Sequence, residues 1–211
     1  MNINIRLDGL KDAMKAFDPK VANRAVNSAL KKIAAQAKTE ASGVIRERYA
    51  IKKADLDRKI AVRPPIRTGE MTVELSLTSR PISLSYFGAQ QVMGNRVLSR
   101  KGKALVSKTL KRASSLPAGV RYQILKSGGK QFRKNAMMAR MKSGHIGVFR
   151  FTGKPMASNP KRKAIAEVAM VTPSTLFGSK RTVDAINRLV QAKFNGILRH
   201  ELDYFMRGGA K

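Results

Sequence analysis

Between Glu74 and Glu167 the chain contains no acidic residue. This interval, residues 75–166, is 92 residues long and holds 20 Lys or Arg, so it supplies +20 of the formal net charge of +30. No side chain within it can neutralise another, and uniform charge destabilises a compact state through self-repulsion. A segment that folds in spite of this implies a counter-ion from outside. A nucleic acid, an anionic membrane and an acidic protein surface are the three kinds of partner that fit.

The composition otherwise indicates a folded chain. A hydrophobic fraction of 43% over 211 residues is ordinary for a globular protein and suits one domain spanning residues 1–211. The absence of cysteine excludes disulfides, thiolate nucleophiles and Cys-ligated zinc. Residues 1–10 lack the apolar core of a signal peptide, and no run of 18 apolar residues suggests a membrane span. We therefore expect synthesis in a cytoplasm and residence there or in a particle.

Periodicity predicts a long helix near each end of the chain. Asp18 and Pro19 form a typical helix start, with Asp as the N-cap. From there a helical stripe runs to about Tyr49, through Val26, Leu30, Ile33, Ala37, Ala41 and Val44. A second stripe predicts a helix from about Lys180 to Met206, ended by two glycines. A short helix is expected over residues 53–60.

Alternating apolar residues predict strands elsewhere. The segments with this period are residues 1–10, 71–77, 82–86, 120–124, 136–141, 146–151 and 165–171. Ser127–Lys130 and Ser143–His145 have the composition of hairpin turns. The fold class that follows is α+β, with the N- and C-terminal amphipathic helices packed on an antiparallel sheet.

Two basic segments, residues 88–119 and 154–163, have no clear period and are predicted as long loops, the first with a short helix near residues 104–110. Lys and Arg in such loops can neutralise a phosphate backbone without reading its sequence. The candidates for contact with DNA or with an acidic neighbour are Arg96, Arg100, Lys101, Lys103, Lys108, Lys111, Arg112, Lys130, Arg133, Lys134, Lys161, Arg162 and Lys163.

Residues 136–151, AMMARMKSGHIGVFRF, carry a fairly specific motif. The piece KSGHIGVF within them resembles the signature of the prophage minor tail protein Z family. Three weaker pieces occur in the family's order: RAVNSA at residues 24–29, RPISL with FGAQQ at residues 80–91, and PSTL at residues 173–176. The main departure is residues 95–118, which are longer and more basic than the family pattern.

The resemblance implies a tail completion protein of a long-tailed bacteriophage. Such proteins act where the tail joins the head, usually as a ring around the path of the DNA. The expected partners are five further copies in a homo-hexamer, neighbouring tail and connector proteins, and double-stranded DNA. The expected location is the virion, after synthesis in the host cytoplasm. No reaction, cofactor, metal or small-molecule substrate is expected.

Other functions have weaker support. His145 could serve a small basic ribonuclease, but no partner acid or base has motif spacing, so a local hydrogen bond within its turn is expected. Ser127–Lys130 lacks the spacing of a phosphate-binding loop. A ribosomal-type or other non-enzymatic RNA- or DNA-binding protein remains the alternative. Membrane-surface binding lacks aromatic anchors on a basic helix.

Overall fold

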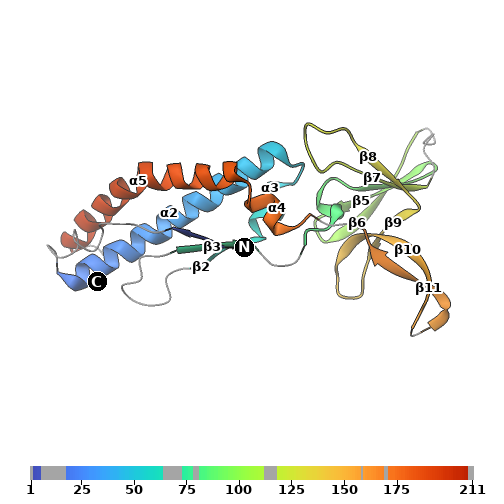
Figure 1. Ribbon diagram of the computed structural model, residues 1–211, viewed down its shortest axis with the longest axis horizontal. Helices are drawn as coiled ribbons and strands as arrows, with labels where there is room; N and C mark the ends of the chain where they lie inside the picture. Colours follow the sequence, from blue (N-terminus) through green and yellow to red (C-terminus); the bar gives the residue numbers. More distant parts are fainter. Residues whose placement is uncertain are drawn as a thin grey trace. The chain divides into compact units, whose positions relative to one another are not determined.

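The computed structural model describes residues 2–5, 18–63, 73–77, 81–111, 118–157, 159–168 and 171–208 (Figure 1). These residues form an α+β structure with antiparallel sheets and a long helix near each end, which confirms the predicted fold class. The chain divides into two compact units where one domain is predicted. The helical unit comprises Met1–Ile45, Leu56–Ser79 and Pro173–Lys211, and the strand unit comprises Arg46–Asp55 and Arg80–Thr172.

The helical unit combines the two long helices with a small sheet. Its helices are α2 (Pro19–Arg48, whose last turn belongs to the strand unit), α4 (Pro173–Phe177) and α5 (Lys180–Met206). Its sheet has the order β1-β3-β2, formed by Asn2–Ile5, Val73–Leu77 and Ile60–Arg63. The short helix α3 (Lys53–Asp57) crosses the boundary between the units.

Helix α2 begins where the sequence predicts, because Asp18 Oδ1 accepts a hydrogen bond from the Lys20 backbone N–H at 2.7 Å. Its buried face is rich in alanine, and six alanines on it are fully buried: Ala22, Ala25, Ala29, Ala34, Ala37 and Ala41. Small side chains let other elements approach this helix closely, and Leu30 and Ile33 are the larger apolar residues at its centre that are fully buried.

An ion pair between a half-exposed lysine and a buried glutamate joins the two long helices, which run side by side in Figure 1. Lys32 Nζ donates to Glu201 Oε1 at 2.5 Å, and the Glu201 side chain is only 3% exposed. Burial is the largest influence on this carboxyl and raises its pKa. Hydrogen bonds from Lys32 and Ser28, with the positive charges of Lys32 and His200, outweigh burial, so the pKa of Glu201 lies below its ordinary value.

Substituting Lys32→Met should destabilise the helical unit by about 1–3 kcal/mol at pH 7, because among the described residues Glu201 then keeps Ser28 as its one side-chain donor. A carboxyl with a lowered folded-state pKa contributes stability above its unfolded pKa and loses it as pH falls through the folded value. The difference between wild type and variant should therefore shrink as pH falls below the ordinary pKa of a glutamate. Urea unfolding, monitored by the circular dichroism signal of the helices at several pH values, measures this difference in the free energy of unfolding. An equal loss from exposed Lys31→Met would contradict the assignment.

The strand unit contains two antiparallel sheets. The five-stranded sheet has the order β6-β5-β4-β7-β8, from Ala104–Thr109, Arg96–Lys101, Gln90–Met93, Gly119–Tyr122 and Gln131–Lys134. The three-stranded sheet has the order β11-β10-β9, from Asn159–Glu167, Ile146–Met156 and Ala136–Arg140. The predicted hairpin over residues 136–151 is confirmed by the pairing of β9 with β10.

The prediction of a basic loop over residues 88–119 is wrong, as is the short helix within it. The described part of this segment is mostly the meander β4-β5-β6. Met93 pairs with Arg96 and Lys101 pairs with Ala104, so each turn has only two residues. Gly94 and Gly102 make these turns with φ of 56° and 61°. Because β6 is mostly exposed, its sequence does not alternate regularly between apolar and polar residues, and the strand was not predicted.

The prediction of a second loop over residues 154–163 is also wrong, because β10 and β11 extend through this segment as a hairpin. The last seven residues of β10 are exposed, so this part gains no apolar pattern from a core. The predicted strand over residues 82–86 is instead an isolated bridge from Ile82 to Val171, followed by the 3-10 helix η1 (Leu84–Tyr86). The Ser85 N–H donates to Ser83 Oγ and starts this helix.

Candidate nucleic-acid interface

The positive charge of the chain is concentrated in the strand unit. This unit contains 24 Lys or Arg and three acidic residues, a formal charge of +21. The helical unit contains 19 and ten, a formal charge of +9. Two of the three acids in the strand unit are already in ion pairs, Asp55 with Arg100 and Glu167 with His145. The remaining cations therefore depend on solvent ions or on a partner.

Eleven of the thirteen predicted contact residues have exposed side chains: Arg96, Lys101, Lys103, Lys108, Lys111, Lys130, Arg133, Lys134, Lys161, Arg162 and Lys163. They lie on the β5–β6 hairpin and just after it, on the edge strand β8 and its approach, and on the β10–β11 hairpin. Arg112 lies outside the described residues. Exposed Lys and Arg on strands can contact phosphates as well as loop residues can. These residues can therefore still make the predicted contacts, although they lie on strands and not on loops.

The strand register divides these residues between the two faces of the five-stranded sheet. Lys134, Gly119, Val92, Val97 and Lys108 are successive partners in one row, so their side chains share a face. Lys101 lies four residues from Val97 on β5 and belongs to the same face. Neighbouring positions point the other way, which places Arg96 and Arg133 on the opposite face. One flat polyanion cannot contact all the candidates at once.

Arg100 does not fit its predicted role as a solvated phosphate contact. Its side chain is only 10% exposed. Its two terminal nitrogens lie 3.3 and 3.4 Å from the carboxylate oxygens of Asp55, and its guanidinium stacks 3.7 Å from the centre of the Tyr86 ring. An arginine engaged on both sides in this way stabilises the fold. The sequence missed Asp55 as its partner, because the two residues are 45 positions apart.

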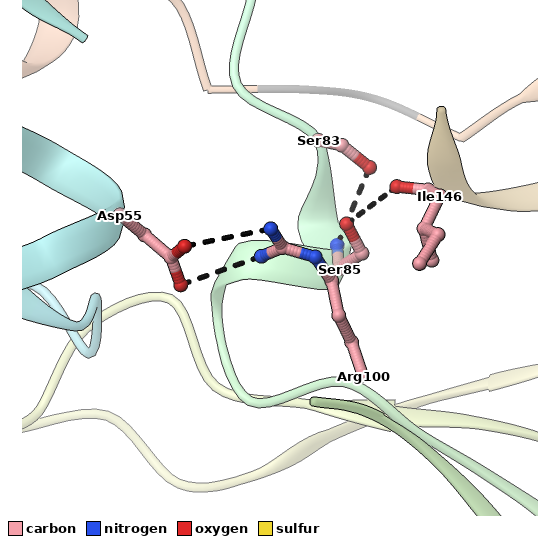
Figure 2. Close-up of polar contacts among 5 residues, drawn as sticks. All are labelled: Asp55, Ser83, Ser85, Arg100 and Ile146. Carbon is pink, nitrogen blue, oxygen red and sulfur yellow. Dashed lines mark hydrogen bonds and ion pairs between the residues drawn. The ribbon is translucent and has the colours of Figure 1, made fainter. Parts of the chain in front are cut away.

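The contact region of Arg100 also joins the two sheets of the strand unit (Figure 2). Ser85 Oγ donates to the Ile146 carbonyl at the start of β10 over 2.7 Å, and Ser85 itself is buried. The adjacent Tyr86 ring lies beneath Arg100 of β5. Helix η1 therefore contacts both β10 of one sheet and β5 of the other, and these contacts hold the two sheets together.

His145 contacts an acid that sequence spacing did not indicate. Its Nε2 lies 3.0 and 3.1 Å from the two carboxylate oxygens of Glu167, 22 residues away, and its ring meets Phe149 edge-on. The expected hydrogen bond within the turn is present in the backbone, where the His145 carbonyl accepts from the Met141 N–H at 2.8 Å. The side chain makes its contact outside the turn, with Glu167. A side chain at Gly147 would come within 2.6 Å of Glu167, so this glycine makes room for the pair.

The described residues contain no metal-binding cluster and no membrane-spanning helix. Among the described residues, no group of three or more His, Asp and Glu could hold a metal ion. No described helix has the length and apolar character needed to cross a membrane. Comparison of the chain with protein-family models, curated proteins and solved structures finds no match.

Proposed function

We propose that this protein is a structural component of a bacteriophage tail, a minor tail or tail completion protein at the head–tail junction. The observation that supports the proposal most is the strand unit, whose formal charge of +21 lies largely on exposed strands and hairpins. The resemblance of residues 136–151 to the tail protein Z family supplies the setting. A protein that surrounds a DNA path needs positive charge without sequence recognition.

In this role the protein acts by position and charge. Lys and Arg on the exposed strands contact phosphates as the DNA passes, and their contacts carry no base information. Copies arranged head-to-tail can close a ring around that path. The exposed end of the β10–β11 hairpin is suited to contact a neighbour, because Phe151 and Ile165 are cross-strand partners and are 54% and 36% exposed.

The direct test is to locate the protein in intact particles. We expect density for on the order of six copies in a closed ring where the tail meets the head. Quantitative mass spectrometry of purified particles should give the same copy number. Absence from particles, or a ring of another symmetry, would contradict the proposal.

The alternative is a ribosomal-type or other non-enzymatic nucleic-acid-binding protein. The same exposed basic strands favour it, because lysines and arginines neutralise the phosphates of an RNA backbone as they do those of DNA. Sedimentation separates the two functions. A ribosomal protein would travel with RNA and would be released by ribonuclease, whereas a tail protein would travel with particles.

A further inference from the structure

A cavity of about 170 Å³ lies at one end of the five-stranded sheet, inside the strand unit. Its lining comes from the segment before β4, the end of β7 and the connection between β7 and β8, with Ala50 closing one side. The polar side chains in this lining are those of Gln90, Arg121, Tyr122, Gln123 and Lys130. None of the described residues that line the cavity is an aspartate or glutamate. A water occupies about 30 Å³ in the liquid, so the cavity has room for a tetrahedral oxyanion with some water.

Arg121 is the residue that most needs a ligand here. Its Nε is buried and has no hydrogen-bond partner among the described residues. The strand register holds it in place, because Arg121 of β7 pairs directly with Gln90 of β4. A buried guanidinium nitrogen without an acceptor costs free energy, and most such groups in native proteins have an explanation. An anion in the cavity would balance the positive charge of this guanidinium.

The other side chains around the cavity suit the same ligand. Lys130 is exposed at its rim and adds a second positive charge. Gln123 Nε2 donates to the carbonyls of Lys126 and Gly128, which holds the connection between β7 and β8 in place. The buried Phe87 ring and the Tyr122 ring provide an apolar wall that lowers the local dielectric. Charge-assisted hydrogen bonds to an oxyanion are strong in such surroundings.

We propose that this cavity is a phosphate-binding site, in which Arg121 binds the phosphate oxygens and Lys130 completes the charge. Through the proposed function, the natural source is a phosphodiester group of the DNA backbone, and free inorganic phosphate is the other source of the same chemistry. The site differs from the exposed basic strands because it is a defined pocket with a guanidinium fixed by the sheet.

The first experiment uses the full-length protein and inorganic phosphate, with sodium chloride held at matched ionic strength. Isothermal titration should show saturable binding to wild type. Arg121→Met should weaken it by about tenfold or more, as expected for a charge-assisted hydrogen bond. Arg140→Met, an exposed arginine of β9, removes the same charge and should change it by less than about twofold. Equal losses in both variants would show an adventitious ion only, and absence of binding to wild type would overturn the site.

The melting temperature of the Arg121→Met variant in sodium chloride alone distinguishes a loss of phosphate contacts from misfolding. Because Arg121 Nε has no partner within the part of the chain that the structure describes, Arg121→Met should melt at the wild-type temperature or above it. A lower melting temperature would show that Arg121 is structural and would overturn the site.

A second arm identifies the source of the phosphate with short duplex DNA. If the cavity takes a backbone phosphate, Arg121→Met should weaken DNA binding more than Arg140→Met does, and inorganic phosphate should compete. Phosphate binding with equal DNA affinities in the two variants would overturn only the DNA source. DNA binding without phosphate binding would overturn the cavity and leave the proposed function standing.

Discussion

Reversing five exposed charges of the strand unit should abolish the binding of double-stranded DNA at physiological salt. The variant carries Glu at Lys101, Lys103, Lys161, Arg162 and Lys163, which are all exposed, and its formal charge falls from +30 to +20. If each side chain neutralises one phosphate, the slope of log affinity against log salt should fall by about 4–5, since each contact contributes about 0.9. Affinity of wild type should show no preference for one duplex sequence. Fluorescence anisotropy over a salt series measures both quantities.

A matched variant of the helical unit controls for net charge alone. Glu at exposed Lys20, Arg24, Lys31, Lys193 and Arg199 also gives +20, and this variant should keep most of the salt slope. Neither variant should melt much below wild type, because lower self-repulsion offsets the loss of solvated side chains. Equal loss of DNA affinity in both variants would show that the strands provide no interface. Early melting of the strand-unit variant would show that its charges are structural.

The second large effect is expected at the Arg100 pair. Substituting Asp55→Ala should destabilise the strand unit by about 3 kcal/mol, because it leaves a guanidinium that is 10% exposed without its carboxylate. That value is at the low end for buried pairs, since the contacts of 3.3 and 3.4 Å are long. The double variant Asp55→Ala, Arg100→Met should recover much of this loss, because an apolar side chain can replace a buried charge. Denaturant unfolding of the three proteins gives the coupling.

Comparing Arg100 with its neighbour Lys101 distinguishes a structural arginine from a residue that contacts phosphate. Arg100→Met should leave DNA affinity within about twofold of wild type, whereas Lys101→Met beside it should reduce the salt slope by about 0.9. Lys101 is exposed, so its replacement should leave stability almost unchanged. A large loss of DNA affinity in Arg100→Met, at unchanged stability, would restore Arg100 to the interface.

The elements with one buried face were predictable from the sequence. The stripe through Leu30 and Ile33 predicts α2, and the pattern around KSGHIGVF predicts the β9–β10 hairpin, because in both a core selects apolar residues at a fixed period. Strand β6 and the outer half of β10 have exposed side chains on both faces. No core imposes a period on them, so only the two-residue turns at Gly94 and Gly102 could have revealed the meander.

The site was predictable only in part, for a related reason. Composition identifies the basic segment, and eleven of its thirteen proposed contacts are exposed. The partners of Arg100 and His145 lie 45 and 22 residues away and are brought near by tertiary structure. Arg121 was missed because nothing in its neighbourhood along the chain distinguishes it from other arginines. Its significance depends on a cavity wall made by four separate segments.

The order of the five-stranded sheet leaves β6 and β8 at its edges, and this affects how the protein behaves in concentrated solution. An open edge can recruit a strand from another copy and begin an aggregate. Lys108 on β6 and Arg133 and Lys134 on β8 would then face like charges across the new ladder, which is unfavourable. This repulsion operates only while no anion neutralises these side chains. A polyanion added near charge equivalence removes this protection, so handling the protein with DNA calls for high salt until the two are to be combined.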